Sequence, residues 1–382
     1  MARRGTISSW LATHSRCKIP AHALSPINGL GGLAALALIV EAVTGVLLAL
    51  YYVPAMGETN LAHQSVEAIT YKLRFGFLLR GIHYWAAQAM LVLSILHFIK
   101  TYLAANYRPP KGPCHFVGVV LGILTVAACV TGYSMKADVI GVEAIMIGQS
   151  LVKRMPLGPL LFRAIYGTGT LDDALLRYFS IHYALGGVLL GLFLLHVWWS
   201  HRHHAAPPMT GERPRPAMPV WPNFFLSVLS GSLMLLGFLV VLSALAPPEL
   251  GERFLPGQPI RPGVPEWFMV GDYTLIKSGV DPVFAGVYFP IGAALVAALV
   301  PWIDSEGSRH PRHRRFATTY LIVFFSEIAV FTAWGYLSVG QQIPFEQELA
   351  VGLITAAASG SLGVWLTRPR VYRFGKEAGG RG

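Results

Sequence analysis

Two apolar stretches, HYWAAQAMLVLSILH at residues 83–97 and HYALGGVLLGLFLLH at residues 182–196, each begin and end with a histidine. The interval between the two histidines of a stretch is close to four turns of an α-helix, so both face the same way. At about 1.5 Å rise per residue they lie about 21 Å apart along the axis. Two such helices side by side would offer two stacked His–His sites. Bis-imidazole ligation of two haems fits that geometry, with buried hydrogen-bonded histidines or a proton path as alternatives. The candidate metal ligands are His83, His97, His182 and His196.

The composition is that of an integral membrane protein. Of the 382 residues, 54% are hydrophobic and only 13% are charged, which is too apolar for a soluble domain. The net charge of +11 does not indicate a nucleic-acid partner, because the basic residues cluster in loops that flank apolar stretches. Cys17, Cys114 and Cys129 form neither a haem attachment motif nor an iron–sulfur framework. Any iron–sulfur centre must therefore come from a partner.

Eight apolar runs approach the length of about 20 residues that a helix needs to cross a bilayer. They predict an all-α membrane protein, with a four-helix bundle that holds two haems followed by a second four-helix half. A polar, proline-rich linker at 204–219 separates the two. We expect an N-terminal domain over 1–210 and a C-terminal domain over 211–382. The predicted spans lie near 30–53, 77–104, 115–134, 179–200, 222–246, 283–303, 317–338 and 348–366.

The distribution of basic residues predicts the topology. The termini and the loops on their side carry 19 Lys and Arg residues, and the loops on the other side carry 11. Since cytoplasmic loops are enriched in Lys and Arg, both termini are expected in the cytoplasm. The N-terminal residues 1–20 lack the apolar core of a cleaved signal peptide and could lie on the membrane surface.

Glycines repeat with the histidine spacing. Gly31 and Gly45 in the first predicted helix are separated by the same interval as the histidines, and so are Gly118 and Gly132 in the third. Close helix packing through small residues is one interpretation. The other is that each glycine leaves room for a flat macrocycle, so that two glycine helices and two histidine helices surround two haems.

Several motifs agree with this arrangement. They are Asn28, Gly31, Thr44 and Gly45; Arg80 three residues before His83; Gly132 with Tyr133; Arg177 five residues before His182; VPEWF at 264–268; and PWIDSEGSRHPRHRR at 301–315. Together they resemble cytochrome b, the membrane subunit of bc-type quinol oxidoreductases, over nearly the whole chain. The segment 301–315 resembles fused bacterial forms of this family.

The resemblance implies roles for individual residues. His83 and His182 would ligate an outer, low-potential haem, and His97 and His196 would ligate an inner, high-potential haem. Both would be non-covalent b-type haems. Arg80 and Arg177 would neutralise haem propionates, with anchoring at the membrane edge as the alternative for both.

Two residues are implied at quinone sites. Glu266, in the VPEWF segment, would accept a proton at an outer quinol oxidation site, because quinol oxidation releases protons. A solvated loop glutamate is the alternative. His201 would bind quinone at an inner site, although it begins a basic run at 201–204 that would equally suit lipid headgroups.

The implied function is electron transfer from quinol through two b haems, coupled to proton translocation by a Q cycle. The chain would be the electron-transfer subunit of a quinol:cytochrome c oxidoreductase in a bacterial cytoplasmic membrane, inactive alone. A Rieske-type iron–sulfur protein and a c-type cytochrome would be its partners in a homodimeric complex with bound lipid. One alternative is a dihaem, quinone-reactive anchor of a periplasmic oxidoreductase that does not bifurcate electrons. A haem-free transporter that moves protons through its histidines is another.

The chain departs from the family pattern at the outer site. Lys136 and Ala137 replace a Pro–Trp pair in GYSMKAD (132–138), Glu143 stands where an aromatic residue is expected, and Phe268 replaces a tyrosine. These changes put the competence of the outer site in question. No covalent extra haem is expected, because Gly29 occupies the position of its cysteine and Cys17 lies too far upstream. Many relatives carry an acidic residue of the inner site at the start of the fifth helix. No such acid is evident in this chain, where Asn223 is the residue nearest to that position.

Overall fold

The structure is a computed structural model that describes residues 18–20, 26–202, 217–219, 222, 225–257, 263–277 and 279–368. Eight helices among these residues are long and apolar enough to cross a membrane, as the sequence predicts. They are α2 (Leu30–Ala49), α4 (Gly76–Leu103), α5 (Gly112–Ser134), α8 (Leu171–Arg202), α9 (Phe225–Leu245), α11 (Phe289–Ile303, preceded by the π-helical turn η4, Phe284–Tyr288), α12 (Arg315–Leu337) and α13 (Phe345–Leu366).

The first four spanning helices form a bundle. Helix α2 packs on α4, α5 packs on α8, and the two pairs meet through α4 with α5 and α2 with α8. A buried apolar layer fills the middle of the bundle, with Ala37 and Leu38 from α2, Met90 from α4, Ala128 from α5 and Leu189 from α8. All four helices therefore contribute to one core, which fixes their faces relative to one another.

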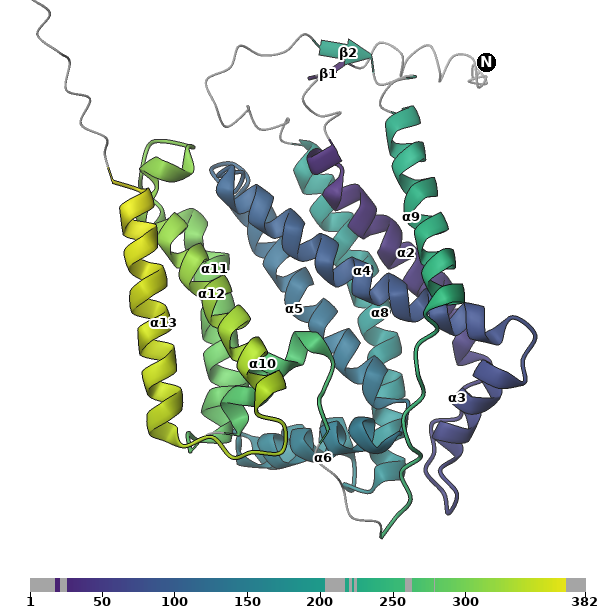
Figure 1. Ribbon diagram of the computed structural model, residues 1–382. Coiled ribbons are helices and arrows are strands. Elements are labelled where there is room, and N and C mark those ends of the chain that lie inside the picture. The colour runs from purple at the N-terminus through teal and green to yellow at the C-terminus, as the bar shows by residue number, and fades with distance from the viewer. Residues whose placement is uncertain are drawn as a thin grey trace, which may run out of the picture.

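The later spanning helices divide into two groups. Helix α9 lies along α4 and α2, on the side of the bundle away from α13 (Figure 1). Helices α12 and α13 pack together, α10 (Trp267–Ile276) lies against α12, and α11 joins this group to the bundle through α5. The predicted domain boundary at 210/211 lies outside the described residues.

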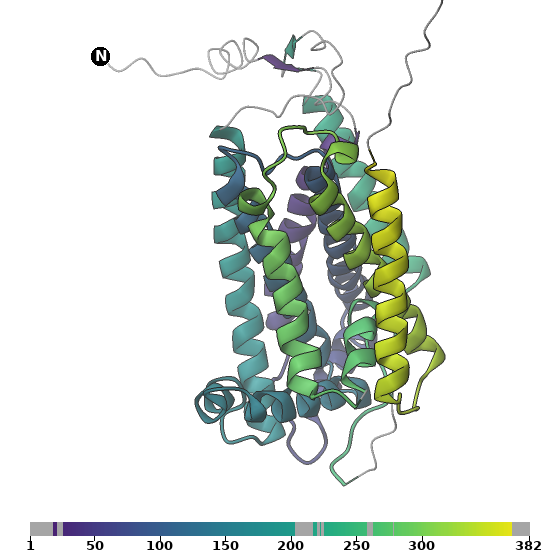
Figure 2. The same ribbon diagram turned by 90° about the vertical axis from the view of Figure 1, so that its left-hand side faces the viewer.

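Short helices gather at one end of the spanning bundle, here named the α6 end. Helix α6 (Val139–Arg154) crosses this end at a steep angle to the spanning helices, with α3 (Leu61–Tyr71) beside the bundle (Figures 1 and 2). Helix α7 (Gly158–Tyr166) packs between α6 and α8. Asp138 caps α6 by accepting a 2.8 Å hydrogen bond from Gly141 N. The sequence prediction of spans could not include these helices, because they are too short to cross a bilayer.

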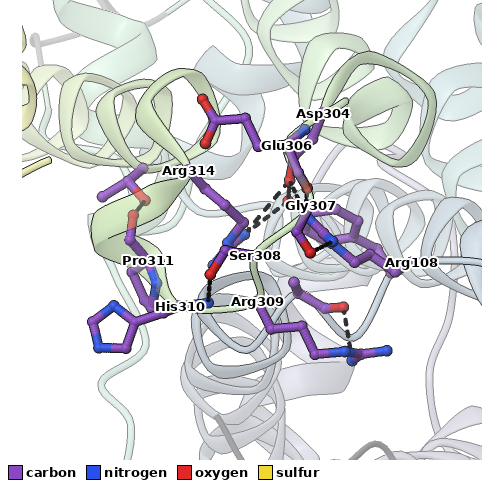
Figure 3. Close-up of polar contacts among 12 residues, drawn as sticks. Arg108, Asp304, Glu306, Gly307, Ser308, Arg309, His310, Pro311 and Arg314 are labelled. Carbon is purple, nitrogen blue, oxygen red and sulfur yellow. Dashed lines mark hydrogen bonds and ion pairs between the residues drawn. The ribbon is translucent and has the colours of Figure 1, made fainter. Parts of the chain in front are cut away.

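The opposite end carries a two-stranded antiparallel ribbon of β1 (Lys18–Pro20) and β2 (Ala217–Pro219), here named the β end (Figure 1). The loop between α11 and α12 covers the end of α4 there, and Figure 3 shows its polar contacts. Arg314 is fully buried, and its Nη1 donates to Tyr102 O at 3.0 Å and to Tyr107 Oη at 2.7 Å. The Tyr107 hydroxyl donates to the Asp304 carboxylate, which supplies the counter-charge for Arg314. This network ties the two parts of the chain together.

Candidate functional site

The four predicted histidines form two facing pairs inside the bundle. The pair nearer the α6 end joins His83 of α4 to His182 of α8, with ring centroids 6.4 Å apart and planes at 70°. The pair nearer the β end joins His97 to His196, also at 6.4 Å and with planes at 77°. The equal separations follow from the equal sequence interval between the histidines of two neighbouring helices.

This separation fits a metal ion between the two rings. With metal–nitrogen bonds of about 2 Å on either side and a ring radius of about 1 Å, the centroids of two ligating imidazoles lie about 6 Å apart. Direct packing without a ligand would not require the same distance in both pairs. The donor set, two neutral imidazoles per site in an apolar bundle, is the one that bis-imidazole haem ligation uses.

Hydrogen bonds orient three of the rings. Nδ1 of His182 lies 3.0 Å from Ala128 O and 3.1 Å from Thr131 Oγ1, and Nδ1 of His196 lies 3.0 Å from Cys114 O. Nδ1 of His83 lies 2.9 Å from Thr44 Oγ1. Occupied Nδ1 atoms place the hydrogen there and leave Nε2 as the ligating atom, as is usual for metal-bound histidines.

The four predicted glycines lie directly against the histidines. A Cβ added to Gly31 would lie 2.9 Å from Cε1 of His97, and one added to Gly132 would lie 2.9 Å from Cε1 of His182. The corresponding distance is 3.3 Å from Gly45 to His83 and 3.1 Å from Gly118 to His196. Each glycine therefore makes room for one ring, and a side chain at any of these positions would press on a candidate ligand.

Arg80 and Arg177 lie at the α6 end, where each donates hydrogen bonds to backbone carbonyl oxygens. Arg80 donates to Pro248 O at 2.9 Å and to Glu249 O at 3.0 Å, and Arg177, which is exposed, donates to Ala164 O at 2.9 Å. Both positions are within the first two turns of the helices that carry His83 and His182. Neutralisation of propionates by these side chains stays a prediction.

Glu266 lies against the helix that carries His83. It is the residue before α10, and its Oε2 accepts a 3.4 Å hydrogen bond from the hydroxyl of Tyr84, the neighbour of His83. Next to it, Trp267 Nε1 donates to Gln88 Oε1 of α4 at 2.6 Å. These two contacts fasten the VPEWF segment to the helix that carries His83. A proton-accepting role for Glu266 stays a prediction.

The divergent loop of residues 132–138 is firmly held in an unusual conformation. Ala137 has a positive φ of 50° and is fully buried, and its carbonyl accepts a 2.8 Å hydrogen bond from Asn60 Nδ2. Asn60 Nδ2 also donates to Phe254 O at 2.8 Å. Lys136 Nζ lies 3.1 Å from Asp138 Oδ2. The charge that Lys136 introduces is therefore paired.

Glu143 adds a second carboxyl group near the VPEWF segment. Its Oε2 would lie 3.8 Å from a Cβ added to Gly263, three residues before Glu266. Burial raises the pKa of Glu143 above its ordinary value, against the opposing effect of a hydrogen bond with the Gly263 backbone. The expected aromatic wall is thus replaced here by a partly buried acid.

His201 lies at the β end of α8, in an open groove of about 480 Å³ lined by Val197, Trp198, His201 and Arg202. Its Nδ1 bonds to Val197 O at 2.8 Å, and the guanidinium of Arg202 lies 5.2 Å from the Trp198 ring. Its ring is exposed, so Nε2 can reach a ligand in the groove. The predictions for Cys17, Asn223 and residues 1–17 of the N-terminal segment fall outside the described residues.

Sequence reasoning did not assign three partners of the histidines, although Thr44 belongs to a motif that it quoted. Thr44 and Thr131 each precede a glycine of the repeat, and that shared Thr–Gly pair is a signal in the sequence. Glu41 Oε2 lies 3.1 Å from His83 Nδ1, and only its position one turn before Gly45 could have indicated this contact.

Together the spanning helices and the facing imidazoles define a polytopic membrane protein whose bundle has the form that dihaem ligation requires. Comparison with known families agrees. Residues 16–204 match the model described as cytochrome b/b6/petB, and residues 261–357 match cytochrome b(C-terminal)/b6/petD. The two matches cover well over half of the chain, which belongs to the cytochrome b/b6 family. Haem binding and electron transfer in a bc-type complex follow from this membership.

Individual relatives cover most of the chain. Cytochrome b of Cereibacter sphaeroides is 27% identical over 399 residues, covering 93% of this chain and 87% of that protein. Cytochrome b of Rickettsia bellii is 26% identical over 340 residues, covering 87% and 83%. A solved structure described as a hyperthermophilic respiratory complex III has a TM-score of 0.74 at 22% identity and covers 96% of both chains, which shows the shared fold.

Proposed function

We propose that the chain carries electrons from quinol across the membrane through two non-covalent b haems, one between His83 and His182 and one between His97 and His196. The observation that carries the proposal is the equal 6.4 Å separation of the two facing pairs. Bound haem supplies one-electron redox chemistry in a low-dielectric bundle. Residues of the chain orient three of the four ligands through Nδ1, and the four glycines make room for the rings.

Quinol oxidation would take place at the α6 end. Glu266 would accept a proton from quinol and release it at the same end of the molecule, since it lies in the loop before α10. Its hydrogen bond from Tyr84 holds the carboxyl group next to the helix of His83. Quinone reduction would take place at the β end, where His201 in the 480 Å³ groove would donate a hydrogen bond and a proton.

The complex and its location complete the proposal. The chain would be the membrane subunit of a quinol:cytochrome c oxidoreductase with a Rieske-type iron–sulfur protein and a c-type cytochrome, in a homodimer within a bacterial cytoplasmic membrane. The β end would face the cytoplasm, as the excess of Lys and Arg on that side indicates. A Q cycle would send one electron to the iron–sulfur partner and the other through both haems.

A second candidate is a dihaem quinone anchor that does not bifurcate electrons. The observation that favours it is the charged loop at the α6 end, where the Lys136–Asp138 ion pair and Glu143 stand where an apolar, aromatic wall is expected. The anchor would use the same haem ligands. The two candidates therefore differ only in what happens at the outer quinol site.

Haem content after substitution of single histidines tests the ligand assignment. We expect two haems per chain in the purified complex, loss of one in His182→Ala, and loss of the other in His196→Ala. His115, a histidine of α5 that bonds to Ala297 O at 2.9 Å instead of facing another histidine, is the matched control. Full haem content in His182→Ala would refute the assignment of the haem ligands. Loss of haem in His115→Gln, with haem retained in the two alanine variants, would refute it equally.

A further inference from the structure

Glu41 carries an ionisable side chain in the middle of a spanning helix. It is the single acidic or basic residue in α2, and its side chain is only 13% exposed. Its Oε1 is buried and has no hydrogen-bond partner among the described residues. Charged side chains within a membrane are costly and usually functional. None of the roles assigned so far to the ligands or quinone sites uses this carboxyl group.

The carboxyl group contacts a candidate haem ligand. Glu41 Oε2 lies 3.1 Å from Nδ1 of His83, on the side of the ring opposite the ligating Nε2. Thr44 Oγ1 lies 2.9 Å from the same Nδ1, but its own hydrogen is donated to Val40 O at 2.6 Å. Both oxygens therefore lie close enough to Nδ1 to accept its hydrogen.

The partner ligand on the other side of the bundle provides an internal comparison. Helices α2 and α5 each carry a Thr–Gly pair against this histidine pair, and four residues before the glycine stand Glu41 in α2 and Ala128 in α5. His182 receives two neutral acceptors, Ala128 O and Thr131 Oγ1. Only the His83 side of the repeat has a carboxyl group.

We propose that the Glu41 carboxylate accepts the Nδ1–H hydrogen bond of His83 and thereby lowers the reduction potential of the outer haem. Glu41 is a positioning residue that acts through His83 and touches neither haem nor quinone. The inference rests on the proposed function, because it requires His83 to be a haem ligand. An anionic acceptor makes the imidazole a stronger donor and favours the oxidised iron over the reduced one.

The effect has a direction that suits electron flow. At the β end, His196 Nδ1 bonds to the neutral Cys114 O, with Cys114 Sγ at 3.6 Å. A carboxylate at the outer haem alone would make that haem the weaker electron acceptor. This difference would favour electron transfer toward the inner haem, away from the proposed quinol oxidation site.

Redox titration of the two haems in the purified complex tests the proposal. In Glu41→Gln, which keeps the shape of the side chain and removes the charge, we expect the reduction equilibrium of the outer haem to shift at least tenfold toward reduction. For one electron this is about 59 mV upward. The inner haem is expected to keep its potential.

Two control variants distinguish the effect of a carboxyl group next to His83 from the effect of a carboxyl group elsewhere in the spanning helices. Glu327→Gln removes another carboxyl group of a spanning helix, one whose Oε1 is also buried and has no hydrogen-bond partner in the described part of the chain. This variant is expected to shift neither potential. Glu41→Asp withdraws the carboxylate from His83 by one methylene and is expected to shift the outer potential upward by a smaller amount. The Glu41→Asp variant tests the role of Glu41 if the complex with Glu41→Gln does not assemble.

Each outcome has a defined meaning. An unchanged outer potential in a Glu41→Gln complex that holds both haems would overturn the role of Glu41 and leave the ligand assignment intact. In the absence of an assembled Gln variant, an unchanged potential in Glu41→Asp would overturn it equally. A wild-type complex without haem would instead refute the proposed function itself.

Discussion

Substitution of Gly31 by alanine should weaken binding of the inner haem. The added Cβ would lie 2.9 Å from Cε1 of His97, whereas unbonded carbons prefer about 3.5–4.0 Å. The ring or the helix must move by roughly the difference, and overpacking of this kind costs about 1–3 kcal/mol. If that cost falls on the ligand geometry, the affinity for the inner haem drops about 5- to 150-fold. The outer haem, held through Gly45 and Gly132, should be unaffected.

The neighbouring glycine is a matched control. A Cβ added to Gly32 would have nothing within 4 Å, and Gly31 and Gly32 both lie in the first turn of α2. Alanine has a helix propensity up to about 1 kcal/mol better than that of glycine at either position, so the helix itself is not weakened. Haem per chain is measured by haemochrome absorbance during dilution of the purified complex. Equal haem retention in Gly31→Ala and Gly32→Ala would refute the reasoning.

Three further expectations concern stability, each measured by unfolding of the detergent-solubilised protein. Asn60→Ala should lower the free energy of unfolding by about 2–4 kcal/mol, because two buried carbonyls lose their donor; a loss under about 1 kcal/mol would contradict this. Asp304→Asn should cost about 3 kcal/mol by leaving the buried Arg314 without its counter-charge, and an unchanged midpoint would count against that account. Burial raises the pKa of Asp272 from 3.8 to about 7, so its contribution to stability is full below about pH 4 and is lost as the pH rises through about 7. Asp272→Asn should reduce this loss of stability with rising pH. An identical pH profile of the free energy of unfolding in the variant would exclude Asp272 as its cause.

The histidine and glycine positions could be predicted from the sequence because helical periodicity alone decides which residues share a face. An interval of nearly four whole turns brings His83 and His97 to one side of α4 whatever the rest of the molecule does. The apolar runs likewise gave the eight spans to within a few residues, except that α8 begins at Leu171, eight residues before its predicted start. Its first turns contain Asp172 and Asp173, which hydropathy alone assigns to a loop.

Contacts between distant segments could not be predicted in this way. Helix α9 is apolar on all sides, so its sequence does not indicate that it packs on α4 and α2. The contact of Glu41 with His83 joins two different spanning helices and depends on their relative rotation. The buried Arg314 belongs to a stretch that reads as a basic loop, and only the folded chain supplies Asp304 and Tyr107 around it.

Oxidant-induced reduction of haem b in the purified complex tests the central claim most directly. Quinol is present, the inner quinone site is blocked, and oxidant is added while the haem b absorbance is followed. The account predicts a transient reduction of haem b, because removal of one electron from quinol at the Glu266 site would force the second onto the outer haem. Absence of this transient, while both haems remain reducible by quinol through an unblocked inner site, would contradict electron bifurcation and favour the quinone anchor.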